Sequence, residues 1–312
     1  MRKRFLLLIA IEVTIILLLT FTIYLPSFKN EFIRDDEQYI CENTKIQLLN
    51  SHSLYWMSTS FYAANWHPLT WLSHAIDYSL WDLNPGGHRS TNLVLHGFNT
   101  LLVFFLVVAL MMRAKKLNRT TPLVHSTPSI SSDTLIAAGV TSLLFGVHPL
   151  HVESVAWIAE RKDLLCCFFF LLSILSYLPS TSLINKRHQV GWFTTSLLLF
   201  LLALMSKPMA VSLPLILLLI DFYPLKRMER DFKNTSKLLI EKIPFLMASL
   251  ASGILTIFAQ HSGGAIKSFE QIPLGFRLGN ALHSLLFYLK KMARPFELNY
   301  QCFSELFFNS AR

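Results

Sequence analysis

Hydrophobic residues along this chain are gathered into long blocks that are nearly free of charged residues. Several blocks approach the roughly 20 residues that an α-helix needs to cross about 30 Å of hydrocarbon. Strands of a membrane barrel would alternate apolar and polar residues, so unbroken apolar blocks favour helices. The pattern therefore predicts an all-α, polytopic membrane protein with about seven or eight transmembrane helices. The blocks cover residues 5–25, 93–112, 135–147, 164–178, 190–205, 209–223 and 243–259.

Composition excludes an ordinary soluble domain. Hydrophobic residues make up 53% of the chain and charged residues only 15%, and the mean hydropathy is +0.44. Soluble domains usually contain about 25% charged residues. The chain is therefore expected in a membrane, in contact with lipid.

The formal net charge of +9 does not require a nucleic-acid partner, because the positions of the basic residues explain it. They occupy alternate gaps between the apolar blocks, which is the positive-inside pattern, and this places the N-terminus in the cytoplasm. The first block is an uncleaved helix, because it is too long for a signal peptide and no small-residue cleavage site follows it. The basic positions are Arg2, Lys3, Arg4, Arg113, Lys115, Lys116, Arg119, Lys186, Arg187, Lys226, Arg227, Arg230, Lys233, Lys237 and Lys242.

The unusual polar residues fall in the gaps that this topology turns outward. The first outer loop, residues 26–89, is the longest and contains the adjacent Asp35 and Asp36. Within it, residues 69–83 have apolar positions at helical spacing and two tryptophans, which predicts a helix along the membrane surface. The third gap is short and places Lys207 at the outer rim of the bilayer, with Pro208 in the first turn of the next helix.

The second outward gap, residues 148–163, concentrates charge. Each charged side chain would cost about 2.5 to 3.5 kcal/mol at the centre of the bilayer. The segment is therefore expected to form an interfacial turn or to line a watered cavity. Residues 274–295, which follow the fourth gap, carry enough basic residues that both a crossing helix and a surface helix stay open.

These outer clusters supply what transfer of a group from a phosphate-linked lipid requires. Asp35 or Asp36 can take a proton from an acceptor hydroxyl, because adjacent carboxylates repel and the pKa of one of them rises. Lys207, Arg161 and Lys162 can hold the leaving phosphate. The alternative interpretation is a solvated acidic loop with basic residues that reach the lipid headgroups.

His148, His151 and Glu153 are residue types that bind zinc. Pro149 lies between the two histidines and disturbs the helical spacing that would bring the rings together. We therefore expect no metal and no other cofactor here, and we expect capping or orienting roles at a helix end.

Several motifs occur in a specific order. They are Phe32-Ile33-Arg34-Asp35-Asp36, His67-Pro68-Leu69-Thr70, Asn84-Pro85 with His88, Thr91-Asn92-Leu93 with His96, Phe145-Gly146-Val147-His148-Pro149-Leu150-His151-Val152-Glu153-Ser154-Val155-Ala156-Trp157-Ile158, Arg161-Lys162-Asp163, Ser206-Lys207 and Leu219-Ile220-Asp221-Phe222-Tyr223-Pro224. With these motifs the chain resembles the membrane part of the transmembrane and tetratricopeptide-repeat-containing proteins and their bacterial relatives, in the type C glycosyltransferase superfamily. The resemblance extends from about Tyr24 to Tyr300.

This resemblance implies an inverting, metal-independent transfer of a mannose-like sugar from a polyprenyl-phosphate donor. The acceptor would be a hydroxyl group of a protein or glycan on the outer or periplasmic face. Asp35 would be the base and Asp36 would orient it, or the reverse, and Lys207 would bind the lipid phosphate. Substrate-orienting positions would be His67, His88, His148, His151 and Glu153.

The chain departs from the family's usual pattern at two of these positions. His67 stands where the family usually has arginine, and Pro208 stands where it usually has glutamate after the Ser-Lys pair. The first difference exchanges a permanent cation for a titratable ring.

Domain organisation follows from the same resemblance. We expect a membrane domain over residues 1–300 and a short tail over residues 301–312, without the further helices and tetratricopeptide repeats of longer relatives. The short form favours a bacterial inner membrane. The rival function is a truncated, non-catalytic membrane subunit or a carrier of lipid-linked sugar. A transporter is disfavoured, because no internal repeat is visible.

Overall fold

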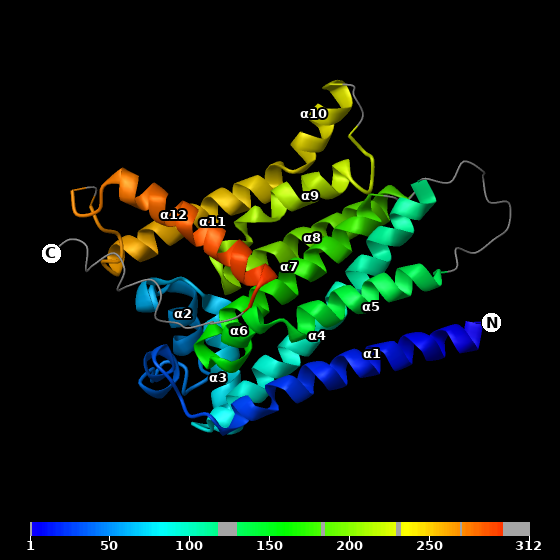
Figure 1. The fold of residues 1–312 in the computed structure, drawn as a ribbon. Coiled ribbons are helices and arrows are strands. Elements are labelled where there is room, and N and C mark those ends of the chain that lie inside the picture. Colours follow the sequence, from blue (N-terminus) through cyan, green and yellow to red (C-terminus); the bar gives the residue numbers. More distant parts are fainter. Residues whose placement is uncertain (1, 118–129, 182–184, 229–231, 269, 296–312) are drawn as a thin grey trace.

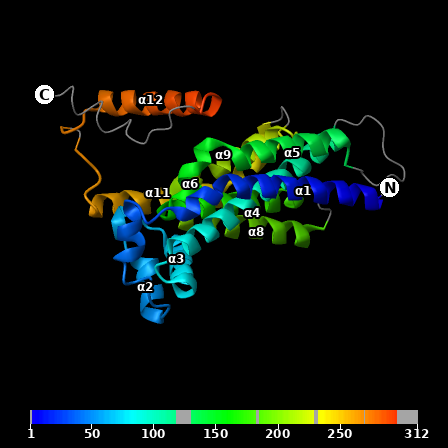
Figure 2. The ribbon, with the colours of Figure 1, turned by 60° about the horizontal axis from the view of Figure 1, so that its bottom comes forward.

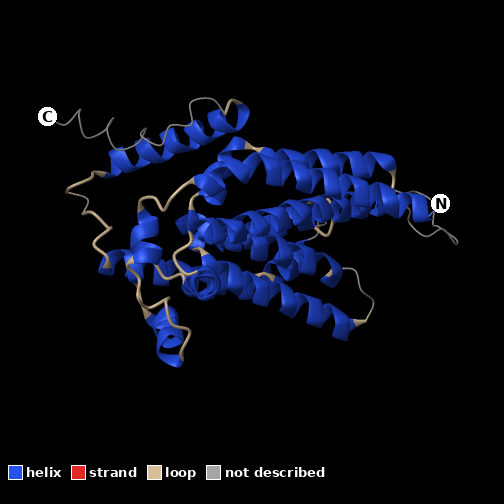
Figure 3. Ribbon diagram, turned by 90° about the horizontal axis from the view of Figure 1, so that it is seen from below, coloured by secondary structure: helices blue, strands red, loops and turns tan. Residues whose placement is uncertain are grey.

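The computed structural model describes residues 2–117, 130–181, 185–228, 232–268 and 270–295, and the predicted tail over residues 301–312 lies outside this part. All regular elements in the described ranges are helical (Figure 3). The prediction of an all-α polytopic membrane protein is confirmed.

Five long helices run side by side and form the body of the bundle (Figures 1 and 2). They are α1 (Arg2–Tyr24), α4 (Pro85–Leu117), α5 (Ser132–Val147), α7 (Arg161–Ser180) and α8 (Lys186–Ser206). Helix α4 packs against α1, α5 and α7, and α7 packs along α8. The apolar side chains that point away from these contacts are available to lipid, as a membrane bundle requires.

In the described part of the chain, fewer helices are long and apolar enough to cross a membrane than the seven or eight predicted. The five that meet both conditions are Leu7–Lys29, Pro85–Leu117, Ile158–Ser180, Lys186–Ser206 and Ile243–Ser262. The number becomes six if α5 and the bent continuation Pro149–Ala156 count as one span with a 47° bend. The segment that begins at Pro208 is divided into a 3-10 turn, Pro208–Ser212, and the short helix α9 (Leu213–Phe222). Most of the last helix, α12 (Leu274–Ala293), projects away from the bundle in Figures 2 and 3. Near its end the Met292 carbonyl accepts from His148 Nε2 at 3.2 Å. The helix carries several basic residues.

The first outer loop folds into a helical cap at one end of the bundle. It contains α2 (Ser51–Thr59) and α3 (Pro68–Trp81), joined by the turn Tyr62–Ala64. Of the two tryptophans in the stretch predicted to lie along the membrane surface, Trp81 is 43% exposed, but the Trp71 side chain is fully buried. Trp71 packs in a core with Tyr39, Met57 and Ile158, so the cap is held to the second outer gap by apolar contacts.

The second outer gap is an interrupted helical turn. Helix α5 ends at Val147, and a 3-10 turn (Pro149–His151), α6 (Val152–Ala156) and another 3-10 turn (Ile158–Glu160) lead into α7. Pro149 ends α5 because a proline nitrogen cannot donate to the preceding turn. The charged end of this segment therefore meets the cap.

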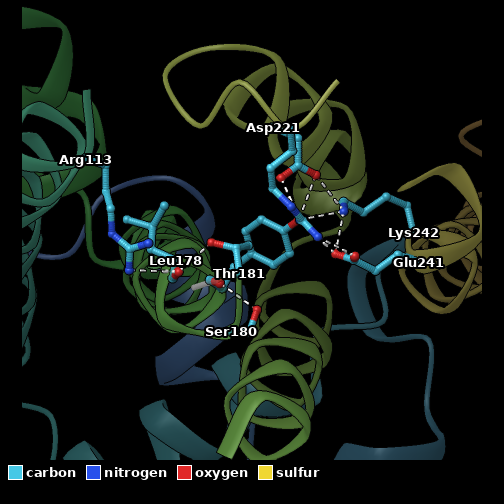
Figure 4. A network of polar contacts seen from close by, with 9 residues as sticks. Arg113, Leu178, Ser180, Thr181, Asp221, Glu241 and Lys242 are labelled. Atoms are coloured by element: carbon cyan, nitrogen blue, oxygen red, sulfur yellow. Dashed lines mark hydrogen bonds and ion pairs between the residues drawn. The ribbon is translucent and has the colours of Figure 1, made fainter. Parts of the chain in front are cut away.

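A polar network, which we call the Tyr177 network, closes the opposite end of the bundle (Figure 4). It consists of Tyr177, Asp221, Arg227, Glu241 and Lys242, from α7, α9, the following loop, α10 (Phe232–Glu241) and the N-terminal end of α11 (Ile243–Ser262). The Tyr177 hydroxyl donates to Asp221 Oδ2 at 2.7 Å, and Lys242 Nζ lies 2.8 Å from the same oxygen. Glu241 and Arg227 form a second ion pair at 2.8 Å. Opposite charges therefore balance where these five segments meet.

Candidate active site

Asp35 and Asp36 have different environments although they are adjacent. Asp36 is fully buried, and its carboxylate accepts hydrogen bonds from the Ala159 N–H at 2.7 Å and from the Ile33 N–H at 3.1 Å. Burial raises the pKa of Asp36, and these two hydrogen bonds oppose the rise. The Asp35 side chain is exposed. Asp36 therefore joins the cap to the second outer gap, whereas Asp35 is free to meet a substrate.

Asp35 lines a cavity of about 540 Å³, which we call the Asp35 cavity. Cavities of this size accommodate small organic ligands. Its wall combines carboxylate, ammonium, carboxamide and aromatic groups. The lining residues are Asp35, Gln38, Tyr39, Phe61, Ala63, Ala64, Asn65, Lys162 and Gly263.

Lys162 connects this cavity to Lys207 through one shared carboxylate, that of Glu160. Lys162 Nζ lies 2.7 Å from Glu160 Oε1, and Lys207 Nζ lies 3.4 Å from Glu160 Oε2. Lys207 also pairs closely with Asp163. Burial acts to lower the pKa of Lys207, but Asp163 and Glu160 raise it by a larger amount. These four residues, the lysine–carboxylate cluster, bring together two of the three predicted phosphate-binding cations and keep Lys207 charged.

The third predicted cation, Arg161, lies elsewhere. Its guanidinium is fully buried and lies 2.6 Å from Asp77 Oδ2. It also donates to Asn92 Oδ1 at 2.7 Å and to the His88 carbonyl at 2.7 Å. Successive residues of a helix point about 100° apart, so Arg161 faces α3 and α4 while Lys162 faces the cavity. A phosphate cannot reach Arg161 in this arrangement.

The predicted orienting histidines of the first loop are buried. The His88 Nε2–H donates to the Asp82 carbonyl at 2.8 Å, and the His88 carbonyl accepts from Arg161, so His88 supports the Arg161 pair. His67 is 2% exposed. Burial, with the charges of Lys162 and Lys207, lowers the pKa of His67 to about 3. The His67 ring is therefore neutral.

The remaining predicted positions lie along the turn between α5 and α7. The His148 side chain accepts from the Leu150 N–H at 3.2 Å, which is a capping contact. The His151 ring packs 4.5 Å from the Phe145 ring, and Glu153 is exposed on α6. Within the described residues, no group of three or more His, Cys, Asp or Glu side chains is arranged to hold a metal ion.

Two polar residues of this region were missed in the sequence. Asp77 is buried within α3 and accepts from Thr91 Oγ1 at 2.9 Å in addition to its pair with Arg161. Arg89 donates to the Ala156 carbonyl at 3.0 Å and to the carbonyls of Asn30 and Glu31. A charged residue at an apolar position of the helical pattern was the signal for Asp77, because such a residue requires a partner.

Comparisons with known proteins reveal several relatives. The chain is 31% identical over 201 residues to "Protein O-mannosyl-transferase TMTC4" of Homo sapiens, which covers 60% of this chain and 26% of that protein. It is 30% identical over 208 residues to "Protein O-mannosyl-transferase Tmtc1" of Drosophila melanogaster, covering 62% of this chain and 21% of that protein. "Protein O-mannosyl-transferase TMTC3" of Homo sapiens is 28% identical over 201 residues.

The similarity covers only part of each relative. The matched region spans about a quarter of the human TMTC4 protein and about a fifth of the fly Tmtc1 protein. No protein-family model matches the chain. No solved structure matches it. The chain is thus a helical membrane protein similar to part of the protein O-mannosyl-transferases, and at the cap end the exposed Asp35 lines the same cavity as Lys162.

Proposed function

We propose that this chain is a glycosyltransferase that moves a mannose-like sugar from a polyprenyl-phosphate donor to a hydroxyl group of a protein or glycan. The observation that carries the proposal is that Asp35 and Lys162 line one cavity, and that Lys162 is linked through Glu160 to Lys207. The relatives' names support the choice of mannose and of a protein acceptor.

The proposed step is a single displacement at the anomeric carbon of the sugar. The acceptor oxygen forms a bond to this carbon while the bond from the carbon to the phosphate oxygen breaks. Asp35 takes the hydroxyl proton, and the polyprenyl phosphate leaves with the bonding electron pair. Attack from the face opposite the phosphate inverts the configuration.

Lys207 and Lys162 are the proposed phosphate-binding residues. Positive charges held in place before reaction stabilise the charge that develops on the leaving phosphate. Glu160 and Asp163 form ion pairs with these lysines, so a bound phosphate would share the two cations with them. Two lysines supply this charge without a metal ion. Arg161 is assigned to the support of Asp77 instead.

The membrane arrangement fits a lipid donor. Helices α1 and α11 expose many large apolar side chains, among them Leu18 at 62% and Ile257 at 62%, so a polyprenyl chain can stay in the lipid. We propose that the cytoplasm holds the N-terminus and that the cavity opens to the outer or periplasmic side. A bacterial inner membrane stays a prediction from the sequence.

The decisive experiment is sugar transfer from radiolabelled polyprenyl-phosphate mannose in membranes that contain the chain. Asp35→Asn should abolish incorporation, whereas Glu37→Gln, a change at an exposed carboxylate of the same loop, should not. Incorporation that persists in Asp35→Asn overturns the role of Asp35. Donor binding without turnover in the unchanged chain would support the rival function, a carrier or non-catalytic subunit.

A further inference from the structure

The turn formed by residues 61–65 has an unfavourable backbone. Ala63 has a φ of 51° and Ala64 has a φ of 59°. This left-handed region is disfavoured for residues with a Cβ atom, and two such residues in succession are rare. Contacts from outside the turn must therefore hold it in this conformation.

The C-terminal end of α11 supplies such contacts. Gln260 Nε2 donates to the Ala64 carbonyl at 2.9 Å and lies 3.4 Å from Asn65 Oδ1. One turn later, Gly263 approaches so closely that an added Cβ atom would lie 2.3 Å from Ala64 Cβ. A side-chain amide and a close glycine contact therefore clamp the turn onto α11.

Additional hydrogen bonds connect the same turn to the segment that carries Asp35. The Tyr62 hydroxyl donates to the Gln38 carbonyl at 2.9 Å. Asn65 Nδ2 lies 3.4 Å from the Tyr39 hydroxyl. The turn is thus fixed between α11 on one side and the segment after Asp35 on the other.

The clamped turn is also one wall of the Asp35 cavity. Phe61, Ala63, Ala64 and Asn65 line it, as do Gln38 and Tyr39. Carboxamides both donate and accept hydrogen bonds, which matches the hydroxyl groups of a sugar ring. Aromatic rings offer apolar faces for its C–H groups. The groups on this wall suit a polyhydroxylated ring.

We propose that Gln260 is a positioning residue. It clamps the 61–65 turn and so positions the wall of the Asp35 cavity that determines which sugar binds. The clamp is a property of the fold, and its effect on transfer rests on the proposed function. Gln260 acts through the turn and does not line the cavity itself.

Two variants disturb the clamp from different directions. Gln260→Leu removes the donor at similar volume, and Gly263→Ala pushes against Ala64. Their matched controls are Gln271→Leu, at an exposed glutamine near the same end of the bundle, and Gly253→Ala, at a glycine of α11 where an added Cβ meets nothing within 4 Å. All four variants should elute in detergent as the unchanged chain does.

The first readout does not require activity. Phe61→Cys, in a background without Cys41, Cys166, Cys167 and Cys302, is labelled with a water-soluble maleimide in membranes. Gln260→Leu and Gly263→Ala should each change the labelling rate severalfold, and the two controls should leave it unchanged. Equal rates in all variants would overturn the clamp.

The second readout is the division between KM and kcat for polyprenyl-phosphate mannose. Gln260→Leu should raise KM about five- to twentyfold and leave kcat within about twofold, because the wall contributes to binding and not to proton transfer. An altered labelling rate with an unchanged KM would overturn the specificity role. Failure of the proposed function gives a different pattern, since the unchanged chain would then transfer no sugar while the labelling result stands.

Discussion

Asp36 Oδ1 accepts a hydrogen bond from the Ala159 N–H at 2.7 Å, across 123 residues of sequence. Ala159 immediately precedes Glu160 and lies three residues before Lys162, so this contact fixes the loop of the proposed base relative to the proposed phosphate-binding lysines. Because Asp36 is fully buried, its acidic side chain serves the architecture of the site.

Substitutions of Asp35 and of Asp36 should therefore have different effects. Asp36→Ala leaves the buried N–H group of Ala159 without its acceptor, which should cost about 1 to 3 kcal/mol of unfolding free energy. The Ile33 N–H also loses its acceptor but is only partly buried, so it adds less. Asp35→Ala should leave stability nearly unchanged and remove transfer. Thermal unfolding in detergent, combined with transfer per folded molecule, checks both. Equal destabilisation by the two variants would contradict this division.

Substitutions of Arg161 and of Lys162 should likewise have different effects. Arg161→Ala leaves the buried Asp77 carboxylate without its cation, and breaking a buried ion pair costs about 3 to 5 kcal/mol. The double variant Arg161→Leu, Asp77→Leu should recover part of this loss, because no charge stays buried. The measurement is a double-mutant cycle on thermal stability. If Arg161→Ala is stable but cannot bind a phosphate-linked lipid, then Arg161 belongs to the donor site after all.

The sequence was sufficient for the fold class and for the neighbourhood of the site. Apolar blocks and alternate basic gaps predict the helical bundle, and the motifs place Asp35, Lys162 and Lys207 on one side. The sequence could not distinguish Asp35 from Asp36 or Arg161 from Lys162. Adjacent residues point in different directions, and only tertiary packing decides which side chain is buried: α3 and α4 enclose Arg161, and the second outer gap encloses Asp36.

Contacts between distant segments were the other information that the sequence lacked. Gln260 follows an apolar block, and nothing in the sequence marks it as a partner of the 61–65 turn. The length of the apolar blocks also overstated the number of spans, because Pro208 and Pro214 shorten the segment that ends at Phe222. Length and hydropathy do not show where a helix is broken.

His67 should make the stability of the chain depend on pH. Burial lowers its pKa from 6.5 to about 3, so the unfolded chain binds a proton between these values and the folded chain does not. Stability is therefore unaffected above pH 6.5 and falls as the pH decreases below it, by about 1.4 kcal/mol for each pH unit. At pH 5 the loss due to His67 should be about 2 kcal/mol.

His67→Gln should remove this part of the pH dependence. Thermal unfolding at pH 7 and at pH 5 gives the difference for each variant, and the decrease on acidification should be smaller in His67→Gln. The comparison isolates His67 from His74, whose pKa is also lowered by burial. An identical decrease in both chains would mean that His67 is protonated in the folded state.

Lys207 should act on donor binding more than on stability. Its side chain is 25% exposed and that of its partner Asp163 is 23% exposed, so water can reach the Asp163 carboxylate after Lys207 is removed. Glu160 stays paired with Lys162. Lys207→Ala should raise KM for polyprenyl-phosphate mannose at least about tenfold, which corresponds to about 1.4 kcal/mol of binding free energy. Lys45→Ala, at an exposed lysine of the first loop, is the matched control. Equal effects of the two changes would point to general attraction of anionic lipid.

The Tyr177 network should govern stability from the end of the bundle opposite the cavity. Lys242→Met leaves Asp221 buried with only Arg227 as its cationic partner, and this should cost about 3 kcal/mol, at the lower end of the range for a broken buried pair. Asp221→Asn added to Lys242→Met should restore part of the stability, because the uncompensated charge is removed. Lys242 immediately precedes α11, whose other end carries Gln260 and Gly263. Lys242→Met should therefore also change the maleimide labelling of Phe61→Cys, whereas an unchanged labelling rate would show that the clamp on the 61–65 turn is independent of the Tyr177 network.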